Sequence, residues 1–342
     1  MADLIVEVVH IDEIRPHPDP ETTRLELAVV KGWQTVIPKG KYSAGDVAIY
    51  VPPDTIVPEE TAELWGVAPY LGTGGRVKSV RLRGEMSYGF LADSDGAEVG
   101  KNVAADYGLT KWEPPARFTD RDLEPEHPAF HRYTDIERYE NFPGLLVEGE
   151  EVVITEKIHG TNSRVGLIRH PNEAHEPFFL CGTHQSQIIQ GRETLYERPL
   201  LMDEVKNLLQ MAYNDFEARS VILFGEIYGW VQSLRYGHDK NGSSYRAFDL
   251  SIDGKYLDWN DVCRYCEENG VQTVPELYCG PFSAAKLLEL SGGQTTLGAN
   301  HVREGVVVHP VAERRSSVGT RMILKRISDE YELKRDKISD SH

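Results

Sequence analysis

The sequence predicts an α+β protein with two domains, and three features of the chain indicate this. Its 342 residues are more than one average hydrophobic core accommodates. Residues 1–105 contain short β-branched and aromatic runs separated by Gly, Pro and Asp, a pattern typical of an all-β domain. From residue 148 onward, strand-like runs alternate irregularly with helical ones, which favours antiparallel sheet with helices packed on it.

Residues 1–105 are expected to form a small β-barrel of the oligonucleotide/oligosaccharide-binding (OB) kind. Five or more short strands within about 100 residues suit such a barrel, although a β-sandwich fits the same pattern. The strand-like runs are LIVEVVHIDEI, LELAVVKG, WQTVIPKG, DVAIYVP, RVKSVRLRG and YGFLAD.

A group of cations occurs within one of these expected strands. Arg76, Lys78, Arg81 and Arg83 fall within eight residues of a chain whose formal net charge is −17. Such a charge excludes bulk electrostatic capture of nucleic acid, so a nucleic-acid surface must be local. The four cations are a candidate phosphate-contacting strip. A solvated edge strand protected by charge is an equally good interpretation.

The rest of the chain divides into a connection and a second domain. Residues 106–147 are rich in Pro, Asp and Glu and show little periodicity, so we expect a linker there, followed by a domain over 148–342. Cys263 and Cys266 have a metal-like spacing, but they lie in a helical pattern that ends at Gly270, and ordinary helix cysteines are the better interpretation.

The sequence gives no sign of membrane insertion or export. It contains no apolar run of about 18 residues, and its N-terminus lacks a basic region and a cleavage site. We therefore expect a cytoplasmic protein with no membrane partner.

One lysine stands out as a candidate nucleophile. In the segment VITEKIHGTN, an apolar run delivers Lys157 into a turn at Gly160, next to Glu156, His159 and Asn162. A lysine amine is protonated at neutral pH, so covalent chemistry requires neighbours that favour its neutral form. Alone, this pattern is more often a strand end with an exposed lysine.

Four later apolar, strand-like runs contain or adjoin a charged or aromatic residue that could belong to an active site. Glu226 lies in VILFGEIYG, Phe248 in RAFDLSI, Glu304 in REGVVVHP and Lys325 in RMILKRIS. Taken singly, each is more often a surface charge or a core aromatic residue.

Together, the five segments resemble the five motifs of the covalent nucleotidyltransferases, which include RNA ligases, DNA ligases and capping enzymes. In chain order they are EKIHGTN, FGEIYG, AFDL, EGVVV and ILKR. The form Lys-x-His-Gly-Thr-Asn is similar to RNA ligases. Only 17 residues follow Lys325, so the C-terminal barrel of DNA ligases and capping enzymes is not expected. With a barrel-like domain before the nucleophile and a TDIER segment in between, nearly the whole chain resembles the Deinococcus-type nick-sealing RNA ligases.

This resemblance implies an antiparallel-sheet nucleotidyltransferase domain and a three-step reaction. Lys157 would take AMP from ATP, pass it to an RNA 5′-phosphate, and the phosphate would then be joined to a 3′-hydroxyl. Glu226 and Glu304 would hold Mg²⁺ or Mn²⁺, and Lys325 would contact the α-phosphate as a second catalytic residue. The implied partner is nicked duplex RNA or an RNA/DNA hybrid with a ribonucleotide 3′-hydroxyl end, bound by a monomer.

The resemblance also implies nucleotide contacts. Phe248 would stack on adenine and Asn162 would contact the adenylate. Glu156 would accept a hydrogen bond from the adenine amino group, and Ile158, Glu226 and Lys325 would complete the nucleotide site.

The chain departs from the family pattern in three ways. Many RNA ligases carry two lysines one residue apart in the last motif, whereas Lys325 is followed by Arg326 and Ile327, which leaves Arg326 or Arg321 as substitutes. The arginine expected downstream of the nucleophile is missing, and the alternatives for its role are His184, Gln185 and Arg164. His159 stands where many relatives have an aspartate, so a third carboxylate would come from Asp249 or Asp258.

Two other function classes remain open. The same lysine chemistry serves DNA ligases and capping guanylyltransferases, and a non-catalytic RNA-binding relative would keep the fold without the reaction. Retention of every expected reactive residue type favours the enzyme.

Overall fold

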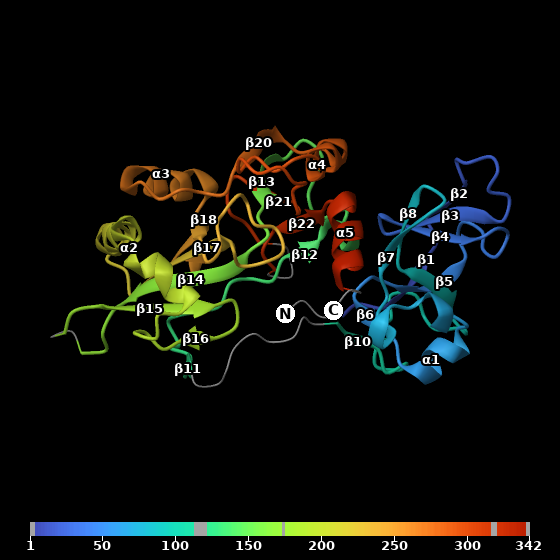
Figure 1. Ribbon diagram of the computed structural model, residues 1–342, viewed down its shortest axis with the longest axis horizontal. Helices are drawn as coiled ribbons and strands as arrows, with labels where there is room; N and C mark the ends of the chain where they lie inside the picture. The colour runs from blue at the N-terminus through green and yellow to red at the C-terminus, as the bar shows by residue number, and fades with distance from the viewer. Residues whose placement is uncertain (1–3, 113–121, 173–174, 316–319, 340–342) are drawn as a thin grey trace. The chain divides into compact units, whose positions relative to one another are not determined.

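The computed structural model describes residues 4–112, 122–172, 175–315 and 320–339. The chain forms two compact units, and each is described by itself (Figure 1). Unit 1 contains Met1–Ala116, Glu137–Pro143 and Asp329–His342, and unit 2 contains Arg117–Ile136 and Gly144–Ser328. Within the described ranges, no helix is long and apolar enough to span a membrane.

Unit 1 is built mainly from short antiparallel strands. One sheet has the order β1-β5-β9 and another β2-β3-β4, while β10 pairs with β6 and β7 with β8. In the described part of unit 1, these pairings form several small sheets rather than one closed barrel. The strands are β1 (Glu7–His10), β2 (Glu13–Pro16), β3 (Leu25–Val30), β4 (Trp33–Pro38), β5 (Val47–Val51), β6 (Thr55–Ile56), β7 (Ser79–Leu82), β8 (Glu85–Tyr88), β9 (Phe90–Asp93) and β10 (Thr110–Lys111), with helix α1 at Glu59–Leu64.

Two segments from later in the chain also belong to unit 1. Strand β12 (Glu137–Arg138) is followed by a 3-10 turn (Tyr139–Asn141), and helix α5 is Asp329–Ser339. The buried carboxylate of Glu332 pairs with Arg138 at 2.5 Å, and the Tyr88 hydroxyl donates a hydrogen bond to Asp329. The Trp33 indole donates to Asn141 at 2.8 Å. The segment expected as a linker, 106–147, therefore contributes to both units, and the end of the predicted second domain folds with unit 1.

Unit 2 contains two antiparallel sheets, as predicted for an α+β domain. The first has the order β11-β16-β15-β14-β17-β18-β19, and the second includes β20-β13-β21-β22. The strands are β11 (Leu123–Glu124), β13 (Glu151–Lys157), β14 (Thr161–Ile168), β15 (Phe178–Thr183), β16 (Gln187–Ile188), β17 (Ser220–Gly229), β18 (Ser243–Ile252), β19 (Lys255–Tyr256), β20 (Glu276–Pro281), β21 (Gly305–Pro310) and β22 (Leu324–Ile327).

Helices complete the core of unit 2. Helices α2 (Asp203–Asp215) and α3 (Trp259–Asn269) contact each other, and both pack on the first sheet (Figure 1). Helix α4 (Ala284–Ser291) begins after Ser283, whose side chain accepts the Lys286 N–H as an N-cap and so satisfies one free donor of the first turn. The buried α2 side chains recur at helical spacing, namely Val205, Leu208, Leu209 and Ala212.

Candidate active site

Strand pairing places Lys157 beside Glu304. Lys157 is the last residue of β13, whose Val152, Val153 and Ile154 are fully buried. In the register of β13 with β21, Lys157 lies opposite Gly305, so the preceding Glu304 comes next to the lysine. The Lys157 Nζ donates to Glu304 Oε1 at 2.8 Å. The Lys157 side chain is one-quarter exposed, so a ligand can reach it.

The glycine after the nucleophile brings in the second carboxylate. The Gly160 N–H donates to Glu226 Oε1 at 3.0 Å. A Cβ at Gly160 would lie 2.1 Å from the Ile227 carbonyl oxygen, so only glycine allows this close approach of the turn to β17. Asn162 lies opposite Glu226 in the register of β14 with β17, so the two side chains project from the same face.

The two carboxylates have opposite ionisation states at neutral pH. Burial raises the pKa of Glu226 to about 8, a rise that ionised Glu304 supports and Lys157 opposes. Burial acts in the same direction on Glu304, but Lys157 and His159 outweigh it and lower the pKa of Glu304 to about 2. Glu304 is therefore an anion and Glu226 a neutral acid. Paired groups whose pKa values diverge in this way are common at functional sites.

His159 is held from three directions. Its backbone N–H donates to the Tyr236 hydroxyl at 2.7 Å, and its Nε2 lies 3.0 Å from Ser233 Oγ. Its Nδ1 lies 3.4 Å from Glu304 Oε2. The histidine that replaces the expected aspartate is thus part of the Lys157–Glu304 cluster.

The oxygen atoms around Lys157 suit a hard divalent cation. Asn162 Oδ1 is buried and has no hydrogen-bond donor within the described part of the chain, and the buried Glu304 Oε2 has only the long 3.4 Å contact with His159. Carboxylate and amide oxygens are the ligands that Mg²⁺ and Mn²⁺ prefer. No group of three or more His, Cys, Asp or Glu side chains gathers for a metal among the described residues. A cation here would keep several water or substrate oxygens, as Mg²⁺ normally does.

Phe248 and Lys325 lie at half-buried strand positions. Phe248 is in β18 and packs edge-to-face on Tyr133, with ring centroids 4.9 Å apart. Lys325 is in β22 and lies opposite Val307 of β21, the strand between β22 and β13.

Glu156 and Ile158 differ from the exposed groups expected of nucleotide contacts. Glu156 is 1% exposed, and its carboxylate accepts hydrogen bonds from the hydroxyls of Thr295 and Thr296 and from the Thr296 N–H. Ile158 is buried in the main hydrophobic core of unit 2. A contact from Glu156 to adenine stays a prediction, whereas Ile158 has only its backbone to offer.

Asp249 and Arg321 pair with each other rather than serving the site. Arg321 donates to both oxygens of Asp249, at 2.7 and 2.9 Å, and also to Glu313 and Tyr133. Asp258 Oδ1 accepts the Glu313 N–H at 2.7 Å. The charges of Asp249 and Arg321 already compensate each other in the interior. Asp249 is therefore unsuited to be a third carboxylate ligand of a metal, and Arg321 is unsuited to be a second cation that binds phosphate.

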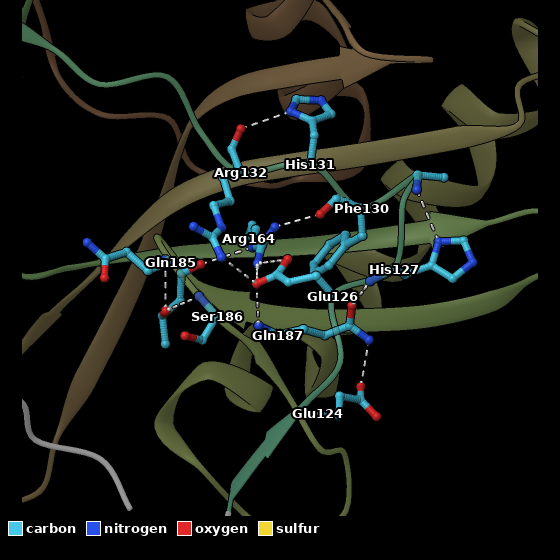
Figure 2. A network of polar contacts seen from close by, with 12 residues as sticks. Glu124, Glu126, His127, Phe130, His131, Arg132, Arg164, Gln185, Ser186 and Gln187 are labelled. Carbon is cyan, nitrogen blue, oxygen red and sulfur yellow. Dashed lines mark hydrogen bonds and ion pairs between the residues drawn. The ribbon is translucent and has the colours of Figure 1, made fainter. Parts of the chain in front are cut away.

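Arg164 also has a structural role. Figure 2 shows its guanidinium next to the Glu126 carboxylate and the Phe130 carbonyl oxygen. Its Nε also donates to the Thr183 carbonyl oxygen at 3.0 Å. The side chain is completely buried, and its ion pair with Glu126 is 2.8 Å long. The alternative that Arg164 reaches a substrate is wrong, because its donors hold Glu126 and Phe130 onto the first sheet.

The expected basic strip is only partly exposed. Arg76 is 3% exposed, pairs with Asp54 at 2.6 Å and lies 3.7 Å from the centre of the Trp112 ring. Lys78 is half-buried, while Arg81 and Arg83 are exposed at the end of β7. Arg76 therefore does not belong to an accessible phosphate-contacting surface.

The cysteines are ordinary residues of the fold. Cys263 and Cys266 lie on α3, as predicted, and all four thiols are free. Burial raises the pKa of Cys266 to about 12.

Sequence reasoning missed Ser233, Tyr236, Thr295 and Thr296. All four lie outside regular strands and helices. Nothing in their local sequence indicates a contact with Glu156 or His159.

Comparisons with known proteins agree with this geometry. A family model described as RNA ligase matches residues 150–327, and one described as an OB-fold domain matches residues 5–93. The predicted N-terminal OB-like domain is thereby confirmed. A comparison with curated protein sequences finds no match.

Solved structures of Naegleria gruberi RNA ligase have a similar fold. A mutant with ATP and manganese is 23% identical, covers 97% of this chain and 99% of its own, and has a TM-score of 0.78. The same ligase with pyrophosphate is 24% identical, covers 98% of this chain and 99% of its own, and has a TM-score of 0.73. The RNA ligase model spans more than half of this sequence. The chain therefore belongs to the RNA ligase family.

Proposed function

We propose that this chain is an ATP-dependent RNA ligase that works through a lysyl-AMP intermediate on Lys157. The observation that carries the proposal is the cluster of a partly exposed lysine at the end of β13, an ionised Glu304 directly before β21 and a mostly protonated Glu226 within β17. The similar structures of Naegleria gruberi RNA ligase include complexes with ATP and manganese, with AMP and manganese, and with pyrophosphate, which supports the choice of nucleotide.

In the first step, the neutral amine of Lys157 attacks the α-phosphorus of ATP, an N–P bond forms and pyrophosphate leaves. The Lys157 ammonium group must first lose a proton to solvent, because it has no free electron pair, and its 2.8 Å ion pair with Glu304 opposes that loss. Glu226, Glu304 and the Asn162 carbonyl oxygen are the groups that would hold a divalent cation. A cation bound there neutralises charge on phosphate oxygens.

Glu226 must lose its proton to act as a metal-holding carboxylate. Its raised pKa indicates that this loss accompanies metal binding. Glu304 needs no such change, because it is ionised already. Phe248 and Lys325 keep their expected roles as adenine platform and α-phosphate contact.

The further steps determine the substrate class. We propose that the enzyme acts as a monomer on nicks in duplex RNA or RNA/DNA hybrids, with a ribonucleotide at the 3′-hydroxyl end. Membership of the RNA ligase family and the match of residues 5–93 to an OB-fold domain support this assignment.

A labelling experiment tests the proposal. The protein is incubated with α-labelled ATP or GTP and Mn²⁺ or Mg²⁺, and acid-resistant label on the polypeptide is measured. Label from ATP that is lost in Lys157→Ala is expected. Label from GTP would instead indicate a guanylyltransferase, and no label from either nucleotide would refute the enzyme. Efficient sealing of all-DNA nicks would refute the ribonucleotide requirement.

A further inference from the structure

The loop that joins β17 to β18, residues 230–242, contacts the turn that follows Lys157 and also carries an aromatic–cation pair whose tryptophan is exposed. Its base is closed by a hydrogen bond from the Trp230 N–H to the Gly242 carbonyl oxygen at 2.7 Å. Thirteen residues without regular structure are long for a hairpin connection, and long ordered loops are usually functional.

Two side chains tie this loop to His159. Tyr236 accepts the His159 N–H, and Ser233 lies within hydrogen-bond distance of the imidazole. Tyr236 is 5% exposed and packs edge-to-face on Tyr228 and His301, with ring centroids 5.2 and 4.6 Å away. Its φ of +51° is unusual for a bulky residue and costs energy that the packing offsets. The loop therefore has a defined position beside Lys157 rather than an arbitrary course.

The same loop carries an exposed Trp230 and a half-buried Arg235. Trp230 is 41% exposed, and the Arg235 guanidinium lies 4.1 Å from the centre of its ring. Within the described part of the chain, Arg235 has no carboxylate partner, so its charge is not neutralised locally. Arg235 is two residues from Ser233, so their Cα atoms are at most about 7.6 Å apart.

Stacked guanidinium and indole groups are a recurring means of binding unpaired RNA bases. A base stacks on the aromatic or guanidinium plane, and the positive charge attracts the neighbouring phosphate. The loop has two fixed cations, Arg235 and Lys240, and one carboxylate, Asp239, although the whole chain carries a net charge of −17. The net charge of the loop is therefore positive, unlike that of the whole chain, and favours contact with a polyanion.

We propose that Trp230 and Arg235 form a stacking platform for a nucleotide of the RNA end that is joined at Lys157. The inference rests on the proposed RNA ligase function and names a contact of that reaction. Because Ser233 and Tyr236 connect the loop to His159, RNA on the platform lies close to the adenylated lysine.

The test separates lysine adenylation from sealing. Adenylation of Lys157 is measured with labelled ATP. Sealing is measured with a nicked duplex in which the 5′-phosphate at the nick already carries AMP and the 3′-hydroxyl at the nick belongs to a ribonucleotide. Trp230→Ala and Arg235→Gln are expected to raise the KM for this RNA by about 5- to 150-fold, the range for loss of one base–aromatic stack. Their adenylation rates are expected to stay at the wild-type level, and Trp230→Phe is expected to retain most of the sealing.

Matched controls lie at the residue after α2 and on α3, both in the same unit. Phe216 is 45% exposed, and Arg264 lies 4.4 Å from the ring centre of Tyr265, so Phe216→Ala and Arg264→Gln remove a similar aromatic surface and a similar stacked cation. Both should seal like the wild type. Unchanged sealing by Trp230→Ala and Arg235→Gln would overturn the proposal, as would a raised KM for ATP in the adenylation step. A wild-type protein that is never labelled would instead refute the proposed function itself.

Discussion

Substituting the two carboxylates near Lys157 one at a time provides a test of how the site controls its nucleophile. Glu304→Gln removes an ionised partner 2.8 Å from the amine, whereas Glu226→Gln replaces a group that is mostly protonated at pH 7, because burial raises its pKa to about 8. In the metal-free protein, we therefore expect Glu304→Gln to make Lys157 more reactive and Glu226→Gln to change it little.

The expected magnitude follows from the geometry of the Lys157–Glu304 pair. The side chains are 25% and 12% exposed, so solvent screens the pair only in part. A hydrogen bond to a charged group contributes roughly 1.5–3 kcal/mol, and each 1.4 kcal/mol changes an equilibrium tenfold. Without Glu304, the fraction of neutral amine at a fixed pH should rise by about 10- to 100-fold.

The assay is the rate at which an amine-selective reagent modifies Lys157 at pH 7 without metal or ATP, read by mass spectrometry of the peptide. Adenylation with ATP and Mn²⁺ is measured in parallel and should fall in both variants by about 100-fold or more, because each loses a metal-holding carboxylate. Equal modification rates in Glu304→Gln and the wild type would contradict the reasoning. So would a rise in Glu226→Gln as large as that in Glu304→Gln.

Three further predictions concern stability and substrate binding. Arg321→Met should lower the free energy of unfolding by about 3–5 kcal/mol, measured by chemical denaturation, because it leaves the buried Asp249 carboxylate without its cation. Burial lowers the pKa of His309, so protonation favours the unfolded chain; stability should therefore fall as the pH drops through about 6.5, and His309→Gln should reduce that slope. Replacing both exposed arginines, Arg81→Gln and Arg83→Gln, should weaken RNA binding and its salt dependence while lysine adenylation persists, and an unchanged salt dependence would argue against a phosphate contact there.

The pairing of Lys157 with Glu304 could be predicted from sequence because both residues lie at the ends of strongly apolar strands. Lys157 ends β13, and Glu304 directly precedes β21, so their meeting needs only the pairing of those two strands. The OB-like domain could be predicted because short strands with turn residues recur throughout residues 1–105.

Long-range ion pairs could not be predicted in the same way. In the sequence, Arg76 looks like another exposed cation of a basic strand. Only the structure shows that it contacts Asp54 and Trp112. Similarly, Arg164 meets Glu126, 38 positions earlier in the chain. Nor does the sequence of α5 reveal that its Glu332 pairs with Arg138, which places the helix in unit 1. Tertiary packing determines each of these pairs, and the local sequence pattern does not indicate them.

The structure also decides between the substitutes for the missing second lysine of the last motif. Successive side chains of a strand point to opposite faces of the sheet, so Arg326 faces away from the side that Lys325 occupies. The residue that shares the face of Lys325 is Ile327, which is 6% exposed and apolar. Arg321 is bound to Asp249 and Glu313. Strand β22 therefore offers one cation to a phosphate from that face, and additional positive charge at the α-phosphate must come from a bound divalent cation or from outside this strand.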